Sequence, residues 1–253
     1  MCILFIAVKQ HEHYPLIIAA NRDEFFVRPT VHSHFWPASP NILAGVDQQA
    51  SGTWMGVNTQ GHIAALTNIR APNNVQANAI SRGLLVKNYL QNPSGYSVAD
   101  MQNTRNHYNG YNLLFGRWDD LKVYNNHQNQ LNSLSTGVYG LSNASLNIPW
   151  PKINKGILGL SHYCQSGHSI KDEDLFTLLL DNTQASDAQL PKTGVPLEWE
   201  RKLSSIFVRS EGYGTRSSTL LKVDINHHVS WLERTYNQDT QCISEQNFEF
   251  DIN

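Results

Sequence analysis

Runs of apolar residues separated by short polar turns open the chain. Residues 3–8 and 16–20 are apolar, and the polar segment 9–15 between them is typical of a turn, so the two runs predict an antiparallel hairpin. Residues 52–58 and 62–67 repeat this pattern around an Asn-Thr-Gln-Gly turn. The first quarter of the chain therefore predicts paired antiparallel strands.

The spacing becomes helical in the middle of the chain. Apolar positions between Leu84 and Leu90 lie on one face of a helix, and Ser97 is placed to cap a second helix that runs to about His107. Pro151 suits the first turn of a helix that continues to about Tyr163, and a further helix is expected over 172–180.

Strand patterns return around and after these helices, and residues 181–200 form a long polar excursion. The expected strands are 111–117, 120–125, 137–141, 204–209, 216–223 and 228–234. Short turns indicate mainly antiparallel sheets, and strands that are apolar on both faces need helices on both sides. The pattern fits an α+β protein with a four-layer αββα sandwich, or a plain two-layer α+β domain. We interpret residues 1–253 as one domain.

Composition narrows the class of protein. The chain has 253 residues, a formal net charge of −2 and no basic run, so neither a nucleic-acid partner nor an anionic membrane surface is indicated. The apolar start ends at Lys9, which is too short for a signal peptide or a membrane span. Three cysteines lie far apart without a CxxC motif, so no disulfide framework or metal site is expected. We predict a cytoplasmic protein without stable membrane insertion.

Cys2 is the first candidate for chemistry because it directly follows Met1. Removal of Met1 would leave a cysteine with both a thiol and a free α-amine. An α-amine titrates near pH ~8 and can act as the general base for its own thiol. The alternative is that Cys2 is a small buried hydrophobic residue.

The polar cluster Asn21-Arg22-Asp23-Glu24 ends the second apolar run. An antiparallel hairpin brings this cluster back beside the start of the first strand, near Cys2. The pattern does not decide which of the four side chains contacts the thiol. Arg22 and Asp23 could equally form an ion pair that closes the hairpin.

Several ordered motifs resemble the NRDE family, also called the transport and Golgi organisation family. They are Met1-Cys2, Asn21-Arg22-Asp23-Glu24-Phe25, Gly52-Thr53-Trp54, Thr67-Asn68-Ile69-Arg70, Ser81-Arg82-Gly83, Tyr111-Asn112-Leu113-Leu114, Gly140-Leu141-Ser142-Asn143, and Tyr213-Gly214-Thr215-Arg216-Ser217-Ser218. That family is more distantly similar to the cysteine N-terminal nucleophile hydrolases that cleave penicillin V and conjugated bile salts. The resemblance implies the αββα fold.

The same resemblance implies a set of site residues. Cys2 matches the nucleophile, and Asn143 and Asn68 resemble the residues that hold an oxyanion. Arg216 resembles the late arginine of the hydrolases. Arg22 and Asp23 match less well, because the equivalent pair is normally separated by two residues and is adjacent here. In this reading, Arg22 and Arg216 favour a thiolate and Asp23 holds the free amine.

Two classes of function follow. The first is hydrolysis of a linear amide or acyl thioester with an apolar acyl part by Cys2, which needs no cofactor and no metal. The second is a non-catalytic carrier of haem or an acyl-coenzyme A, a role that the family resemblance suggests. His11, His13, His227, His228, Met55, Met101 and Cys2 are the axial ligands available for haem, and they show no characteristic spacing. A homo-oligomer is compatible with either class.

Overall fold

Seven strands form the first of two antiparallel sheets. The computed structural model describes residues 2–165 and 171–253. Six of these strands pair in the order β10-β1-β2-β12-β13-β14, and the short β11 pairs with the first residues of β12. The strands are β1 (Cys2–Val8), β2 (Leu16–Phe25), β10 (Gly137–Leu141), β11 (Arg209–Ser210), β12 (Tyr213–Val223), β13 (His228–Tyr236) and β14 (Cys242–Asp251).

The second sheet follows the order of the chain, β3-β4-β5-β6-β7-β8-β9, with every pair antiparallel. Its strands are β3 (Thr30–Trp36), β4 (Ser39–Asp47), β5 (Met55–Asn58), β6 (His62–Asn68), β7 (Tyr111–Arg117), β8 (Asp120–Asn125) and β9 (Gln130–Ser133). Short connections join most neighbouring strands of this sheet, whereas the connection from β6 to β7 is long and carries two α-helices.

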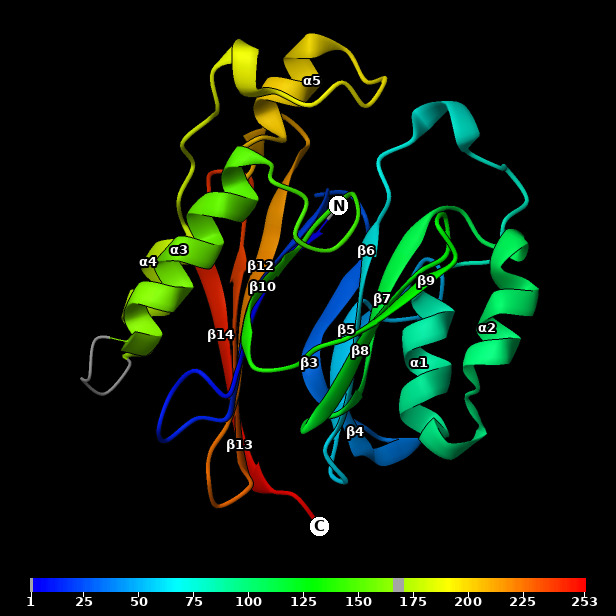
Figure 1. Cartoon of the computed structure of the whole chain (residues 1–253), viewed down its shortest axis with the longest axis vertical. Helices are drawn as coiled ribbons and strands as arrows, with labels where there is room; N and C mark the ends of the chain where they lie inside the picture. Colours follow the sequence, from blue (N-terminus) through cyan, green and yellow to red (C-terminus); the bar gives the residue numbers. More distant parts are fainter. Residues whose placement is uncertain (1, 166–170) are drawn as a thin grey trace.

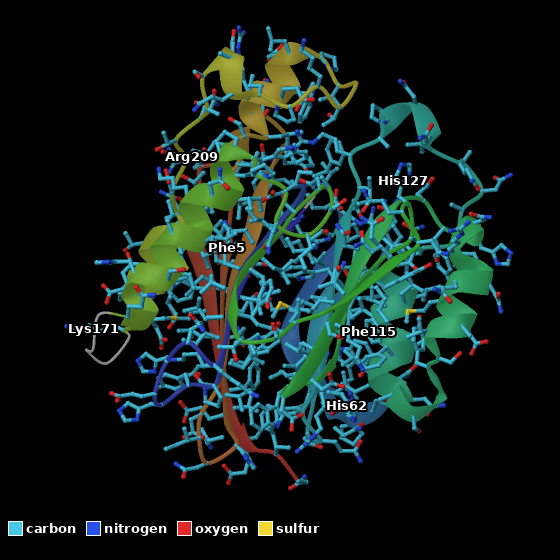
Figure 2. All side chains as sticks on the ribbon, in the orientation of Figure 1. Phe5, His62, Phe115, His127, Lys171 and Arg209 are labelled. Carbon is cyan, nitrogen blue, oxygen red and sulfur yellow. The ribbon has the colours of Figure 1, made fainter. Side chains whose placement is uncertain are left out.

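Helices cover the outer face of each sheet (Figure 1). On one side lie α3 (Pro151–Gln165) and α4 (Asp172–Leu179), and on the other lie α1 (Gly83–Gln91) and α2 (Val98–Thr104), while α5 (Leu197–Lys202) lies at one end. Side chains fill the spaces between the layers, with Phe5 on one side and Phe115 on the other (Figure 2). The four-layer αββα fold expected from the sequence is confirmed.

The alternation of side chains along β1 divides the core into layers. Leu4 and Ile6 belong to the cluster between the two sheets, whereas Ile3 and Phe5 pack with residues of α3 and α4. Successive side chains of a strand point to opposite faces, so Cys2 faces the interior between the sheets, as Leu4 does. Gly156 of α3 permits the close packing of Phe5, since a Cβ there would lie 2.0 Å from the Phe5 ring.

Most of the expected elements are present, and the differences concern strand assignments. The strand expected over 204–209 is wrong. Residues 204–208 form buried turns, and their backbone is held by side chains instead of a strand ladder, since Asn21 Nδ2 donates to the Ile206 carbonyl and the Val208 N–H donates to Thr215 Oγ1. The expected polar excursion 181–200 includes the first residues of α5.

Four strands were not predicted, namely β3, β4, β9 and β14. Each carries many polar residues. In β14, exposed positions alternate with half-buried ones and none is fully buried, because this strand is an edge of the first sheet. Over the described residues, no helix is long and apolar enough to cross a membrane.

Candidate active site between the sheets

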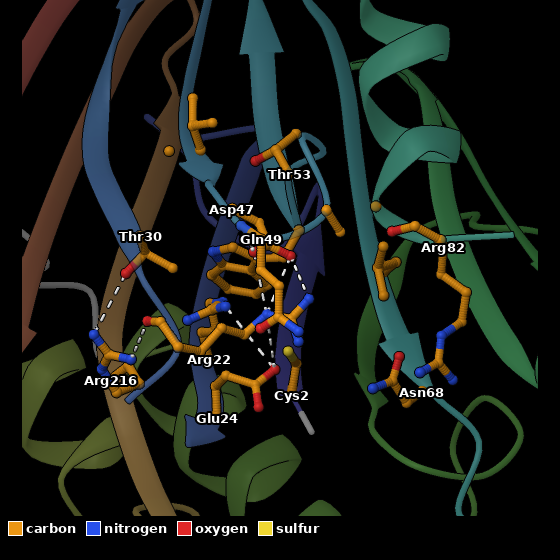
Figure 3. A pocket seen from close by; sticks show the side chains of 18 of the residues that line it. Cys2, Arg22, Glu24, Thr30, Asp47, Gln49, Thr53, Asn68, Arg82 and Arg216 are labelled. Carbon is orange, nitrogen blue, oxygen red and sulfur yellow. Dashed lines mark hydrogen bonds and ion pairs between the residues drawn. The ribbon is translucent and has the colours of Figure 1, made fainter. Parts of the chain in front are cut away.

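A cavity of about 490 Å³ lies between the two sheets at the start of β1 (Figure 3). Five of the six site residues expected from the sequence line it: Cys2, Arg22, Asp23, Asn68 and Arg216. The sixth, Asn143, is buried beside it and does not line the cavity. The fold therefore brings together residues that are more than 200 positions apart in the sequence.

Pairing of β1 with β2 gives the Asn21-Arg22-Asp23-Glu24 cluster two faces. Cys2 and Arg22 are register partners, so their side chains lie on the same face of the sheet. Arg22 and Glu24 line the cavity, and the Arg22 guanidinium lies 4.0 Å from the Glu24 carboxylate. Asn21 points to the opposite face, where its amide donates to the carbonyls of Leu179 and Ile206. Asp23 also lines the cavity, so of the four residues of the cluster Asn21 is the one with a structural role.

The Cys2 thiol is nearly enclosed, with 6% of the residue exposed. Burial raises the pKa of this thiol, and the charge of Asp23 raises it further, whereas Arg22 lowers it. The charge of Arg22 favours the thiolate, as expected, but it does not decide the net direction of the shift. Desolvation outweighs it because the charged form loses its hydration. At neutral pH, Cys2 is a thiol that needs a base.

The Arg216 guanidinium is held by hydrogen bonds to the protein backbone. Its Nη1 donates to the carbonyls of Phe25 and Arg28, at 2.8 and 3.0 Å, and its guanidinium stacks on the Phe26 ring. These contacts hold the turn between β2 and β3 against β12. Arg216 therefore shapes the wall of the cavity more than it supplies a free charge.

A hydrogen bond between Asn68 and Asn143 links the two sheets beside the cavity. Asn143 Nδ2 donates to the Asn68 carbonyl at 3.0 Å, and the Arg70 N–H donates to the Asn143 carbonyl at 2.8 Å. The Ser142 hydroxyl lies 3.2 Å from the Cys2 carbonyl and 3.0 Å from Asn143 Oδ1. The Asn68 side chain lines the cavity and makes no hydrogen bond to the part of the chain that the structure describes. Asn68 can therefore donate to a ligand, while Asn143 fixes its position.

A group of buried charges lies behind Asp23. Thr215 Oγ1 donates to the Asp23 carboxylate at 2.7 Å, and the Arg70 guanidinium pairs with Glu200 at 2.5 Å. Lys152 is 4% exposed, and burial together with the charge of Arg70 lowers the pKa of its amine to about 7. Burial also raises the pKa of Asp23. The interior next to Cys2 thus contains several groups that titrate away from their ordinary ranges.

The sequence alone assigned no role to four further charged residues of the cavity wall, namely Arg28, Asp47, Arg82 and Glu233. Arg28 forms a bidentate pair with Asp47, with Nη2 to Oδ2 at 2.6 Å. Arg82 lies on the wall opposite Cys2, beside Asn68 (Figure 3). The motif Ser81-Arg82-Gly83 was the available signal for Arg82, but nothing in it predicts which wall of a cavity it forms.

The lining of the cavity is rich in charge. Four arginines and four acidic residues contribute to it: Arg22, Arg28, Arg82, Arg216, Asp23, Glu24, Asp47 and Glu233. Of the axial haem ligands named from the sequence, only Cys2 lines the cavity, and His32 lines it in addition. Among the described residues, no group of three or more His, Cys, Asp or Glu side chains could hold a metal ion.

The chain matches one protein family and is similar to known relatives along nearly its whole length. The model of the family described as Transport and Golgi organisation 2 matches residues 1–238. A Transport and Golgi organization 2 homolog of Mus musculus is 33% identical, over 100% of this chain and 99% of the relative. A Transport and Golgi organization protein 2 homolog of Bos taurus is 34% identical, over 93% of both chains.

The chain is also similar to a solved structure, that of a mutant conjugated bile acid hydrolase from Clostridium perfringens. The two share 12% identity, with a TM-score of 0.45, over 100% of this chain and 92% of that chain.

Proposed function

This chain belongs to the Transport and Golgi organisation 2 family, and we propose that it is a hydrolase in which Cys2 attacks a linear amide or an acyl thioester. The observation that carries the proposal is the position of Cys2 at the start of β1, where it lines a cavity between the sheets opposite Arg22 in register. The proposal requires removal of Met1, which lies outside the described residues.

Burial of the Cys2 thiol, which raises its pKa, favours a reaction that begins with removal of the thiol proton. A protonated thiol is a weak nucleophile, so its proton must leave as the sulfur attacks. In the chain without Met1, the α-amine of Cys2 takes this proton, and the new bond forms between Sγ and the carbonyl carbon of the substrate. Asp23, on the neighbouring strand, holds the amine in place.

The tetrahedral intermediate carries a negative oxygen, and Asn68 is the donor that we assign to it. Its amide lines the cavity without another hydrogen bond among the described residues, and Asn143 positions it through the Asn68 carbonyl. The protonated amine then returns its proton to the leaving amine or thiol as the bond to carbon breaks. Water attacks the remaining thioester, which releases the acid and restores Cys2.

A carrier function is the second candidate, and the near-complete enclosure of the Cys2 side chain is the observation that favours it. In this case the cavity would hold haem or an acyl-coenzyme A without cleaving it. Cys2 and His32 would be the axial ligands available to haem at the cavity wall.

The test begins with a protein released from a fusion so that Cys2 is the first residue, verified by intact mass. Release of the leaving group is measured on a panel of octanoyl amides, lactones and thioesters. Cys2→Ala should lose at least about 10³ of the rate, because only binding and oxyanion stabilisation remain. A protein that retains Met1 should also lose most of the rate, because the nitrogen of Cys2 is then a peptide amide and cannot act as the base. Equal release by Cys2→Ala would contradict the hydrolase. Saturable binding of haem or an acyl-coenzyme A at micromolar affinity, about −8 kcal/mol, without such release would support the carrier.

A further inference from the structure

Arg82 differs from the other three arginines of the cavity in the partners of its guanidinium group. Arg28 pairs with Asp47, Arg22 lies 4.0 Å from Glu24, and Arg216 donates to backbone carbonyls. Within residues 2–165 and 171–253, no carboxylate lies within 4.0 Å of the Arg82 guanidinium. Among these described residues, its one hydrogen bond runs from Nη1 to the Gly110 carbonyl at 3.0 Å.

The backbone around Arg82 is held firmly against the cavity wall. The Thr53 N–H donates to the Gly83 carbonyl at 3.2 Å, and Gly52 packs so closely that a Cβ there would lie 2.5 Å from the Gly83 carbonyl carbon. Two glycines at one contact let the segments approach at van der Waals distance. The Arg82 side chain is therefore presented from a fixed backbone, with one guanidinium nitrogen anchored and the others available.

An arginine without a carboxylate partner on the wall of a cavity is a typical recognition group for an anion. A guanidinium stays charged at any physiological pH and offers donors in a planar fork that matches a carboxylate or a phosphate. Leaving such a charge half-buried is unfavourable until an anion joins it. Asn68 lies on the same side of the cavity as Arg82 (Figure 3), so a substrate carbonyl that accepts a hydrogen bond from Asn68 would lie near this charge.

We propose that Arg82 selects ligands that carry a carboxylate or phosphate group, held across the cavity from Cys2. The inference deepens the proposed function, because it names the class of substrate that the same cavity accepts. A purely apolar acyl chain does not use this charge. The ligand is instead an acyl compound with an anionic group that reaches the Arg82 wall.

Three probes of equal acyl length test the proposal in the Cys2→Ala protein, where binding is measured by calorimetry without turnover. They are octanoyl-glycine, octanoyl-phosphoethanolamine and the neutral octanoyl-glycinamide. At least one anionic probe should bind about tenfold or more tightly than the neutral probe, as expected for a charge-assisted hydrogen bond. In Arg82→Gln this preference should fall to within about twofold, while the neutral probe keeps its affinity. The tighter of the two anionic probes identifies carboxylate or phosphate as the preferred group.

Arg117→Gln is the matched control, since Arg117 is exposed and paired with Asp119 outside the cavity, and it should keep the full preference. A preference that survives in Arg82→Gln, equal binding of charged and neutral probes, or no binding of either anionic probe would overturn the inference. If Arg82→Gln does not fold, the affinity of the unmodified cavity for the anionic probe should still fall with added NaCl and that for the neutral probe should not; equal salt dependence overturns the inference. These binding measurements need no catalysis, so they test the role of Arg82 even if the protein is not a hydrolase.

Discussion

Cys2 and Arg22 face each other as register partners on β1 and β2, and both side chains line the cavity between the sheets. This juxtaposition does not produce a thiolate. The thiol is 6% exposed, and the cost of burying a negative charge exceeds the attraction of the guanidinium, so the pKa of Cys2 is raised. A nearby arginine is therefore insufficient evidence for a reactive cysteine.

Thiol labelling of the protein that retains Met1 should reflect this burial. Cys242 is exposed, whereas Cys2 and Cys164 are buried, and burial raises the pKa of Cys164 to about 11. Iodoacetamide near neutral pH should modify Cys242 at least about tenfold faster than Cys2, because the thiolate reacts. Peptide mass spectrometry at timed intervals provides the rates. Faster labelling of Cys2 than of Cys242 would show that the thiol is activated without removal of Met1.

Substitution of Asn68 and of Asn143 should have different effects, the first on catalysis and the second on stability. Asn68→Ala removes the proposed oxyanion donor, so kcat/KM should fall about 10²–10³-fold while the melting temperature stays within a few degrees. Asn143→Ala removes a buried hydrogen bond to the Asn68 carbonyl and should cost about 1–3 kcal/mol of unfolding free energy. Kinetics and thermal melts of both variants check this. The reverse pattern would assign the oxyanion to Asn143, as the family resemblance implies.

The buried pair between Arg70 and Glu200 should be important for the integrity of the site. Glu200 also accepts hydrogen bonds from the Thr193 backbone and hydroxyl, at 2.9 and 2.6 Å, so it fastens the 181–200 segment. Glu200→Gln leaves Arg70 buried without a counter-charge, which typically costs about 3–5 kcal/mol.

The corresponding fall in melting temperature is on the order of 10 °C for a chain of this size. Glu198→Gln is the matched control. That carboxylate is exposed and pairs with Lys202, so its loss should lower the melting temperature by no more than about 2 °C. Equal melting temperatures for the two variants would mean that the Arg70–Glu200 pair contributes little to the fold.

The sequence predicted much of this site because strands alternate. The hairpin of residues 3–20 and the polar cluster at its end were sufficient to place Arg22 beside Cys2. Asn68, Asp23 and Arg216 were found through their motifs, and all three line the cavity. Those motifs could not separate a residue that lines a cavity from one that supports it, as Asn143 illustrates.

Other features depend on long-range packing that no local pattern encodes. Residues 204–208 have the apolar composition of a strand, yet the side chains of Asn21 and Thr215 take up their backbone groups. Lys152 occupies the second position of a surface-like helix start, and only the tertiary structure places its amine beside Asp23, Arg70 and Glu200. Charge burial of this kind follows from the packing of several elements together.

The buried amine of Lys152 makes the stability of the fold depend on pH. Burial, reinforced by Arg70 and opposed by Asp23, Cys2 and Glu200, lowers the pKa of its amine to about 7 in the folded protein, from about 10.5 when unfolded. Between these values the unfolded chain binds more protons, so the lysine destabilises the fold increasingly as pH falls from about 10.5 to about 7, and fully below that. Lys152→Met should therefore gain melting temperature relative to the unsubstituted protein as pH is lowered from 10 to 7, with a plateau below 7. Thermal melts from pH 6 to 10 measure the difference, and the exposed Lys192→Met should show none of this trend. A difference that is independent of pH would mean that Lys152 keeps its ordinary pKa, and that the charges behind Asp23 are solvated better than their burial indicates.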